Sequence, residues 1–332
     1  MKRKKITIPH KMDLLLDDLD RKILYHLDLN SRQSTREIAK KVGSNKNTVN
    51  FRIHKLIERG VITRFSTNIN TAKFGYSNIK VYFQFQDFNE KIEKEFFDYL
   101  KSIKRVGWIV RASGRWDALF CFWAKSSFDF HKIFTKILNR FSRYIYHKEI
   151  IHNINWFYYN RKWLMKNIKV FPVLYGEKPG DEKLDDLDKL ILKRLIENAR
   201  IPITTIANEA KTSSQNVLNR IRKLKKRGII TKFSIDLDYP KLGIVFCKTF
   251  IYLQNITIER LKELYNYCAQ QPKIFALTTT LGAWDLELEF EVENFEEMMS
   301  IMDRIKNKFS DMIRSYESII ITKQSEVRYI EE

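Results

Sequence analysis

Short amides, hydroxyls and basic groups gather on one face of a predicted helix that occurs twice in the chain. In the first copy the face holds Asn45, Lys46, Asn47, Asn50 and His54. In the second copy it holds Ser213, Ser214, Gln215, Asn219 and Arg222. Such groups hydrogen-bond to base edges and phosphates. A plain solvent face would use Glu as freely as Lys, yet the first two turns contain no acidic residue in either copy. We therefore interpret the face as a DNA-contacting surface.

Further residues at and beside this face complete the predicted DNA-binding set. Ser44 stands at the start of the first copy of the helix and is a suitable N-cap. The flanking cations are predicted to bind phosphates rather than to read bases; they are Arg52, Lys55, Arg220 and Lys223.

Three predicted helices position the surface in the first copy. Apolar residues at helical spacing predict a helix over 19–29. Ser34 is a suitable N-cap for a second, short helix. The third helix follows Gly43, with Val49, Ile53, Leu56 and Ile57 as its buried face, and Gly60 is expected to end it in the left-handed conformation. Residues 61–66 read as a wing strand. This order predicts a winged helix-turn-helix.

The chain is an internal duplication. Leu16-Asp-Asp-Leu-Asp20 recurs as Leu184-Asp-Asp-Leu-Asp188, at an offset of 168 residues. About two in five positions of 16–75 are identical at that offset, which chance does not produce over such a span. Gly114-Arg-Trp-Asp117 likewise meets Gly282-Ala-Trp-Asp285. The duplication covers the chain except for a basic arm over residues 1–13.

The second part of each copy shows a strand and helix pattern in the order βαββαβ. In the first copy we expect strands over 79–85, 106–113, 116–123 and 145–154. We also expect two helices, one that ends near residue 103 and one over 127–141. This order predicts a ferredoxin-like sandwich. The predicted class is thus α+β, with helix-turn-helix domains over 14–75 and 184–243, ferredoxin-like domains over 76–158 and 244–332, and a linker over 159–183.

These residues resemble the Lrp/AsnC (feast/famine) transcriptional regulators. The resemblance rests on Leu-Asp-x-x-Asp-x-x-Ile-Leu, then Asn-x-Arg, Ile-Ala and Val-x-x-Arg-Ile-x-x-Leu. It implies a regulator that binds double-stranded DNA and has no cofactor, with RAM-type ferredoxin-like domains that bind small effectors such as amino acids and form oligomers. By the Gly-x-Trp-Asp motif, the implied effector-binding residues are Gly114, Trp116, Asp117, Gly282, Trp284 and Asp285. Lys211 departs from the pattern, because it replaces the Gly43 of the first copy.

Charge supports this interpretation and distinguishes the two halves. The net charge is +20, and each helix-turn-helix segment carries +6, as phosphate binding requires. The first ferredoxin-like domain carries +6 and the second −5. Strict alternation places Glu287, Glu289, Glu291 and Glu293 on one face of a strand. We expect the two domains to pair within one chain, with Lys80, Arg111 or Lys148 offsetting the glutamates; the alternative is that the glutamates face water.

Two other functions stay open. Some relatives that fuse these folds are siroheme decarboxylases, which would need basic and imidazole groups around tetrapyrrole carboxylates. Five of the six histidines lie in the first copy and the sixth, His10, lies in the basic arm; the run His152-Asn-Ile-Asn-Trp-Phe-Tyr-Tyr-Asn-Arg161 is rich in such groups. The other alternative is a co-regulator that dimerises without reading DNA.

Several classes are excluded or disfavoured. Cys121, Cys247 and Cys268 share no short spacing, so we expect small buried hydrophobes and no metal site. The longest apolar stretch, 118–124, is too short to span a bilayer, and no signal peptide pattern follows the basic start. We therefore expect a cytoplasmic protein that is not an enzyme.

Overall fold

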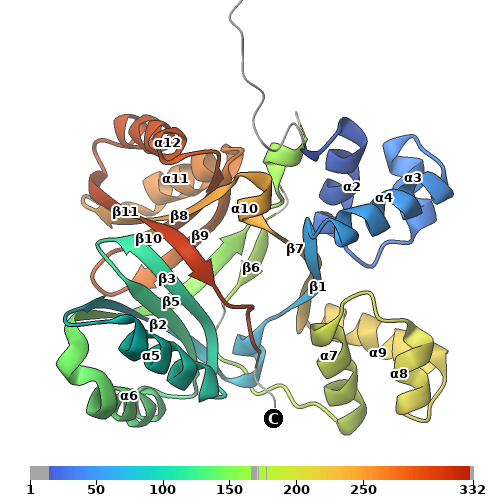
Figure 1. Cartoon of the computed structure of the whole chain (residues 1–332), viewed down its shortest axis with the longest axis horizontal. Helices are drawn as coiled ribbons and strands as arrows, with labels where there is room; N and C mark the ends of the chain where they lie inside the picture. The colour runs from blue at the N-terminus through green and yellow to red at the C-terminus, as the bar shows by residue number, and fades with distance from the viewer. Residues whose placement is uncertain (1–14, 166–169, 171, 177, 330–332) are drawn as a thin grey trace, which may run out of the picture.

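A computed structural model describes residues 15–165, 170, 172–176 and 178–329. Two helical heads lie together on one side of the molecule and a strand-rich body lies on the other (Figure 1). The predicted basic arm over 1–13 lies outside the described residues. Among the described residues, no helix is both long and apolar enough to cross a membrane.

Each head has the three predicted helices and the following strand. The first head contains α2 (Asp18–Leu29), α3 (Thr35–Val42), α4 (Lys46–Glu58) and β1 (Ile62–Ile69). The second contains α7 (Asp186–Glu197), α8 (Ile203–Glu209), α9 (Ser214–Lys226) and β7 (Ile230–Leu237). Each head encloses its own apolar core. The predicted helix-turn-helix folds are confirmed.

The helix ends confirm some predictions and correct others. Ser34 caps α3 in a capping box with Glu37, and Gly60 has a φ of +64° beyond the end of α4. The predicted cap Ser44 is wrong, because the side chain of Asn45 accepts the hydrogen bond from the Thr48 N–H instead. The predicted burial of Ile57 is also wrong, since 40% of it is exposed.

The two predicted wing strands pair with each other. β1 and β7 form a two-stranded antiparallel ribbon, with Phe65 opposite Ile235 and Thr67 opposite Phe233. The ribbon lies between the heads and the body (Figure 1). A strand from each repeat therefore joins the two heads.

The first α/β domain follows the predicted βαββαβ order. It contains β2 (Ser77–Phe85), α5 (Glu90–Ser102), β3 (Val106–Gly114), β4 (Ala118–Ala124), α6 (Ser127–Phe141) and β5 (Ile145–Tyr158), with the 3-10 helices η1 (Thr71–Phe74) and η2 (Ser142–Tyr144). β4 begins two residues later than predicted, because Trp116 lies in the turn. The linker contributes η3 (Lys162–Leu164) and a short strand, β6 (Val173–Tyr175).

The second α/β domain has the same order. It contains α10 (Tyr239–Leu242), β8 (Val245–Leu253), α11 (Ile258–Gln270), β9 (Ile274–Leu281), β10 (Leu286–Val292), α12 (Phe295–Lys308) and β11 (Ile313–Gln324). The prediction of two ferredoxin-like domains is confirmed.

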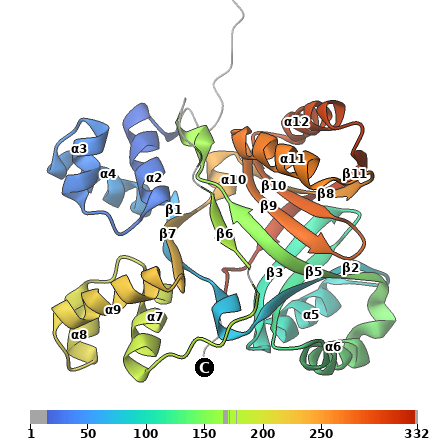
Figure 2. The ribbon, with the colours of Figure 1, turned by 180° about the vertical axis from the view of Figure 1, so that it is seen from behind.

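The two domains close into one barrel. The strand order is β2-β4-β3-β11-β8-β10-β9-β5, and β5 also pairs with β2, so the eight strands form a closed ring to which β6 is added. The long last strand of each domain makes the junction, since β11 pairs with β3 and β5 pairs with β9. The helices lie outside the strands (Figures 1 and 2). The predicted pairing of the two domains within one chain is confirmed.

The glutamate-rich strand shows what the barrel encloses. Leu286, Leu288 and Phe290 pack under the helices of their own domain. The opposite face of β10 turns inward, where Glu287, Glu289 and Glu291 are at most 6% exposed. The alternative that these glutamates face water is wrong for all three. Glu293, at the end of the pattern, is half-buried beside Lys273.

Candidate nucleic-acid interface

The predicted contact face of α4 is exposed. Lys46, Asn47, Asn50, His54 and Lys55 lie at the surface. Asn45 is also exposed, but its Oδ1 atom accepts the N–H of Thr48 at 2.8 Å, so it positions the helix start. Ser44 is half-buried. The structure therefore groups five of the predicted residues on one open helix surface.

The corresponding face of α9 is exposed and more basic. Gln215, Asn219, Arg222 and Lys223 are exposed, and the Asn219 Oδ1 accepts hydrogen bonds from Gln215 at 3.0 Å and Arg222 at 3.2 Å. Ser213 caps the helix by accepting the N–H of Asn216, and Ser214 is half-buried. The last turn adds exposed Lys225 and Lys226, which the sequence-based prediction omitted.

An aromatic residue in the middle of the α4 face was also missed. Phe51 is 60% exposed, and the Nζ of Lys55 lies 5.5 Å from its ring centroid. Phe51 stands four residues after Asn47, so helical periodicity alone could have placed it on the same face. An exposed aromatic ring there can contact the methyl group of a thymine in the major groove. The second head has Asn219 at the equivalent position.

The two predicted phosphate clamps Arg52 and Arg220 have other partners. Arg52 forms an ion pair with Asp17 at 2.6 Å, and Arg220 forms one with Asp185 at 2.5 Å. Each aspartate is also the N-cap of the first helix of its head. The repeated Leu-Asp-Asp-Leu-Asp motif thus connects the first helix to the third. This contact fixes the orientation of each predicted reading helix.

The heads are held against each other by reciprocal contacts. The guanidinium of Arg32 donates to the carbonyls of Ala199 at 2.5 Å and Ile201 at 3.2 Å. Arg200 donates to the carbonyls of Ser31 at 2.7 Å and Gln33 at 3.3 Å. Such a self-complementary contact is typical of a two-fold interface. Together with the β1/β7 ribbon, it fixes the spacing of α4 and α9 within one chain.

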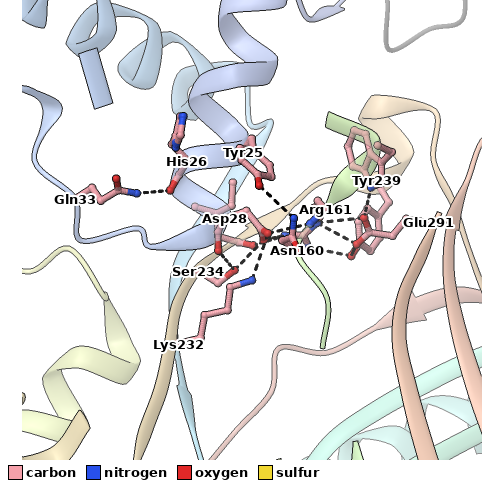
Figure 3. A network of polar contacts seen from close by, with 12 residues as sticks. Tyr25, His26, Asp28, Gln33, Asn160, Arg161, Lys232, Ser234, Tyr239 and Glu291 are labelled. Carbon is pink, nitrogen blue, oxygen red and sulfur yellow. Dashed lines mark hydrogen bonds and ion pairs between the residues drawn. The ribbon is translucent and has the colours of Figure 1, made fainter. Parts of the chain in front are cut away.

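The first head is connected to the barrel by a buried polar network (Figure 3). Arg161, in the linker, forms ion pairs with Asp28 of α2 at 2.6 Å and with Glu291 of β10 at 3.0 Å. Lys232 of β7 also reaches Asp28, at 3.3 Å. Burial alone would raise the pKa of Asp28, but Lys232 and Arg161 hold it below its usual value. The network therefore joins head, ribbon and barrel through charged groups.

Among the described residues, the second head has no equivalent of this network. At the 168-residue offset Tyr329 replaces Arg161, Trp123 replaces Glu291 and Ile196 replaces Asp28. Tyr329 and Trp123 stack with ring centroids 6.4 Å apart. An ionic junction on one side thus corresponds to an aromatic junction on the other. The duplicated chain has two unlike head attachments.

A second buried ionic cluster lies inside the barrel. Glu287 contacts the Nζ atoms of Lys80 at 2.5 Å and Lys248 at 2.8 Å, and Lys248 also contacts Glu289 at 2.6 Å. Burial would raise the pKa of Glu287, but the two lysines hold it well below its usual range. Lys80 is therefore confirmed as a partner. Arg111 pairs with Glu93 instead, and Lys148 is exposed, so both of those predictions are wrong.

The residues implied for effector binding lie in turns and in the barrel interior. Gly114 and Gly282 have φ values of +128° and +153°. The carboxylates of Asp117 and Asp285 accept the backbone N–H groups of Phe85 and Leu253, each at 2.7 Å. Trp116 and Trp284 are at most 2% exposed and pack with Tyr82 and Phe250. These contacts give each residue a folding role, and the effector role stays a prediction.

The cysteines are free and buried, as predicted. Burial raises the pKa of the Cys121 thiol to about 11 and that of Cys247 to about 12. Within the described ranges, no group of three or more His, Cys, Asp or Glu side chains is placed to hold a metal ion.

Comparison with known proteins agrees with both heads. Residues 16–63 match a family model described as winged helix-turn-helix DNA-binding, and residues 184–225 match the AsnC-type helix-turn-helix domain. An uncharacterized HTH-type transcriptional regulator of Pyrococcus horikoshii is 32% identical over 123 residues, which cover 36% of this chain and 81% of that protein. The HTH-type transcriptional regulator FL11 of the same species is 28% identical over 122 residues, which cover 37% of this chain and 80% of that protein.

A solved structure matches nearly the whole chain. The siroheme decarboxylase NirDL has a TM-score of 0.60 at 14% identity, over 95% of this chain and 94% of that chain. At this identity the match concerns the fold, and it shows that the arrangement of two heads on one body occurs elsewhere. The relatives matched by sequence are the size of one repeat. The chain belongs to the Lrp/AsnC family of helix-turn-helix transcriptional regulators, in a form that carries the family's module twice.

Proposed function

We propose that this protein is a sequence-specific DNA-binding transcriptional regulator whose single chain supplies two unequal reading heads. The observation that carries the proposal is the pair of exposed surfaces on α4 and α9, which have no acidic residue in their first two turns and are held at a fixed spacing by Arg32, Arg200 and the β1/β7 ribbon. A fixed pair of third helices suits two half-sites on one face of the duplex.

The two heads are proposed to read different sequences. On α4 the contacts are assigned to Lys46, Asn47, Asn50, Phe51, His54 and Lys55. On α9 they are assigned to Gln215, Asn219, Arg222, Lys223, Lys225 and Lys226. Amides can bind adenine in a bidentate manner, and Phe51 suits a thymine methyl group. The α9 set is richer in cations, so it is assigned more of the phosphate binding. Unlike heads favour a site whose halves differ.

One chain is proposed to be enough for this function. The strand junctions β3–β11 and β5–β9 are made within the chain and complete the barrel. Further association through the RAM-type domains, and a response to a small-molecule effector, are additional proposals that rest on family membership.

The test is DNA binding by head-specific variants. Fluorescence anisotropy would measure the affinity of the full chain for selected duplexes over a series of salt concentrations. Lys46→Ala with Asn47→Ala and, separately, Gln215→Ala with Arg222→Ala should each weaken binding at least tenfold. Lys132→Ala, which removes an exposed cation from α6 outside the heads, is the control and should leave affinity nearly unchanged.

Two outcomes would overturn the proposal. If all variants bound like the unmodified protein, the heads would not read DNA and the co-regulator interpretation would replace ours. If the protein bound an iron tetrapyrrole with Soret absorbance and showed no salt-sensitive DNA binding, the enzyme interpretation would replace it. No described histidine lies in the wall of the cavity between the β1/β7 ribbon and the barrel, where such an enzyme would need imidazole groups.

A further inference from the structure

A chamber of about 330 Å³ lies between the β1/β7 ribbon and the barrel. Its wall comes from both repeats and includes hydroxyl groups of the ribbon, aromatic side chains of the barrel strands, Tyr175 of β6 and Tyr329 near the end of the described chain. The volume lies at the lower end of the range of small-molecule sites. The chamber is separate from the DNA-facing surfaces of α4 and α9.

The charged groups in the wall are already neutralised. Its described residues include four basic and three acidic side chains, and each has an ion-pair partner. Lys232, for example, pairs with Asp28, and Glu289 pairs with Lys248. A charged ligand would have to break one of these pairs or be buried without a counter-ion, and both are costly. The wall therefore favours a ligand without net charge.

Besides the Tyr175 hydroxyl, two buried polar atoms of the wall have no hydrogen-bond partner among the described residues. They are the Oδ1 of Asn153, an acceptor, and the Nε1–H of Trp156, a donor. Asn153 is 8% exposed. Unsatisfied buried groups are rare and costly, so they point to a bound partner. A ligand that carries one donor and one acceptor would satisfy both.

A backbone irregularity brings the two side chains to the same chamber. The register of β5 against β9 shifts between Asn153 and Asn155. In a regular strand, residues three apart point to opposite faces, but the extra residue of a bulge returns them to one side. Ile154, the residue inside the shift, is 46% exposed. Bulges of this kind often re-aim side chains at functional sites.

The aromatic walls favour a flat ligand. Trp156 stacks on Tyr175 with an interplanar angle of 7° and a centroid distance of 5.5 Å. Trp123 lies nearly parallel to Tyr329 at 18° and to Trp156 at 29°, with centroids 6.4 Å away in both cases. These rings stack on one another in a row, and a planar molecule can extend such a row.

From these observations we propose that the chamber binds a neutral, planar nitrogen heterocycle, with Asn153 accepting a hydrogen bond from it and Trp156 donating one to it. Free nucleobases with a lactam edge belong to this class. The binding step requires no DNA, so it can be tested independently of the proposed regulatory function.

The experiment is titration of the full-length protein with hypoxanthine and with uracil, followed by calorimetry and by quenching of tryptophan fluorescence. At least one of the two should bind, whereas benzoate, a planar anion, should not. Trp156→Phe should weaken binding about tenfold, as expected when one neutral hydrogen bond is left unmade. Trp163→Phe is the matched control, because it also removes an indole N–H, which donates to Glu291, and Trp163 lies outside the chamber wall.

Each outcome of the titration either supports or overturns the proposal. Binding of a heterocycle that is weakened by Trp156→Phe and unchanged by Trp163→Phe supports the proposal. Absence of binding by both heterocycles at millimolar concentration overturns it, as does equal binding by all variants or a preference for benzoate. Thermal unfolding of each variant confirms that the fold is intact, and Asn153→Leu provides a second variant if Trp156→Phe fails to fold.

Discussion

Replacement of Arg161 by methionine should release the first head from the barrel. Arg161 is 5% exposed and its guanidinium reaches Asp28, Glu291, the Ile235 carbonyl and the Tyr239 hydroxyl. Removing one member of a buried ion pair costs about 3–5 kcal/mol, because the remaining charge is left without compensation.

The remaining contacts set where in that range the loss should fall. Asp28 would keep Lys232 at 3.3 Å and the Ser234 hydroxyl at 3.1 Å. Glu291 would keep the Tyr239 hydroxyl and the Trp163 indole, both at 2.5 Å. We therefore expect a loss of about 3 kcal/mol, and partial recovery when Glu291→Gln is added, since that change removes the uncompensated charge.

The assay is urea unfolding combined with amide hydrogen exchange. Exchange should accelerate in α2, whose Asp28 loses its ion pair with Arg161, and remain unchanged in α7, which has Ile196 at the equivalent position. Arg115→Met is the control, because its pair with Glu317 is 40% and 37% exposed and should contribute at most about 1 kcal/mol. A loss no larger than that of the control, or equal acceleration in α2 and α7, would refute the reasoning.

Three further predictions concern other parts of the chain. Burial lowers the pKa of Lys162 to about 8. Between pH 8 and pH 10.5, the ordinary pKa of lysine, Lys162 is protonated in the unfolded chain but not in the folded protein. The free energy of unfolding should therefore rise with pH over this window, by at most about 3 kcal/mol. Lys162→Met should abolish that rise in urea titrations. Arg32→Ala with Arg200→Ala should weaken binding to a two-half-site duplex more than to a single half-site; equal effects in anisotropy would contradict the head contact. Lys211 has a φ of +50°, so Lys211→Gly should raise the unfolding free energy by about 0.5–1 kcal/mol, and a decrease would show that the side chain contributes more than the strain costs.

Local patterns predicted the elements and the inward-facing glutamates. Helical spacing identified α2 and α4, and strict alternation placed Glu287, Glu289 and Glu291 on one face of a strand, which the structure shows to be the inner face of the barrel. These features depend on neighbours within one element, so the sequence contains them directly. Because the chain is duplicated, the same patterns predicted the elements of the second copy.

Features that depend on long-range geometry were not predictable. Lys248 and Arg161 neutralise the glutamates, but their roles follow from strand register and from the path of the linker. Arg52 was assigned to phosphates, yet the fold places it beside Asp17, 35 residues away in the chain. The chamber depends on a register shift in β5, and no pattern in the sequence predicts that shift.

Selection of DNA sites from a random library most directly tests the claim that one chain carries two unequal reading heads. The full-length protein should enrich a site with two unlike halves, spaced by one helical turn or a multiple of it. Lys46→Ala with Asn47→Ala should erase the preference in one half only, and Gln215→Ala with Arg222→Ala should erase it in the other. A palindromic site, a loss in both halves with either variant, or no enriched sequence would contradict the account.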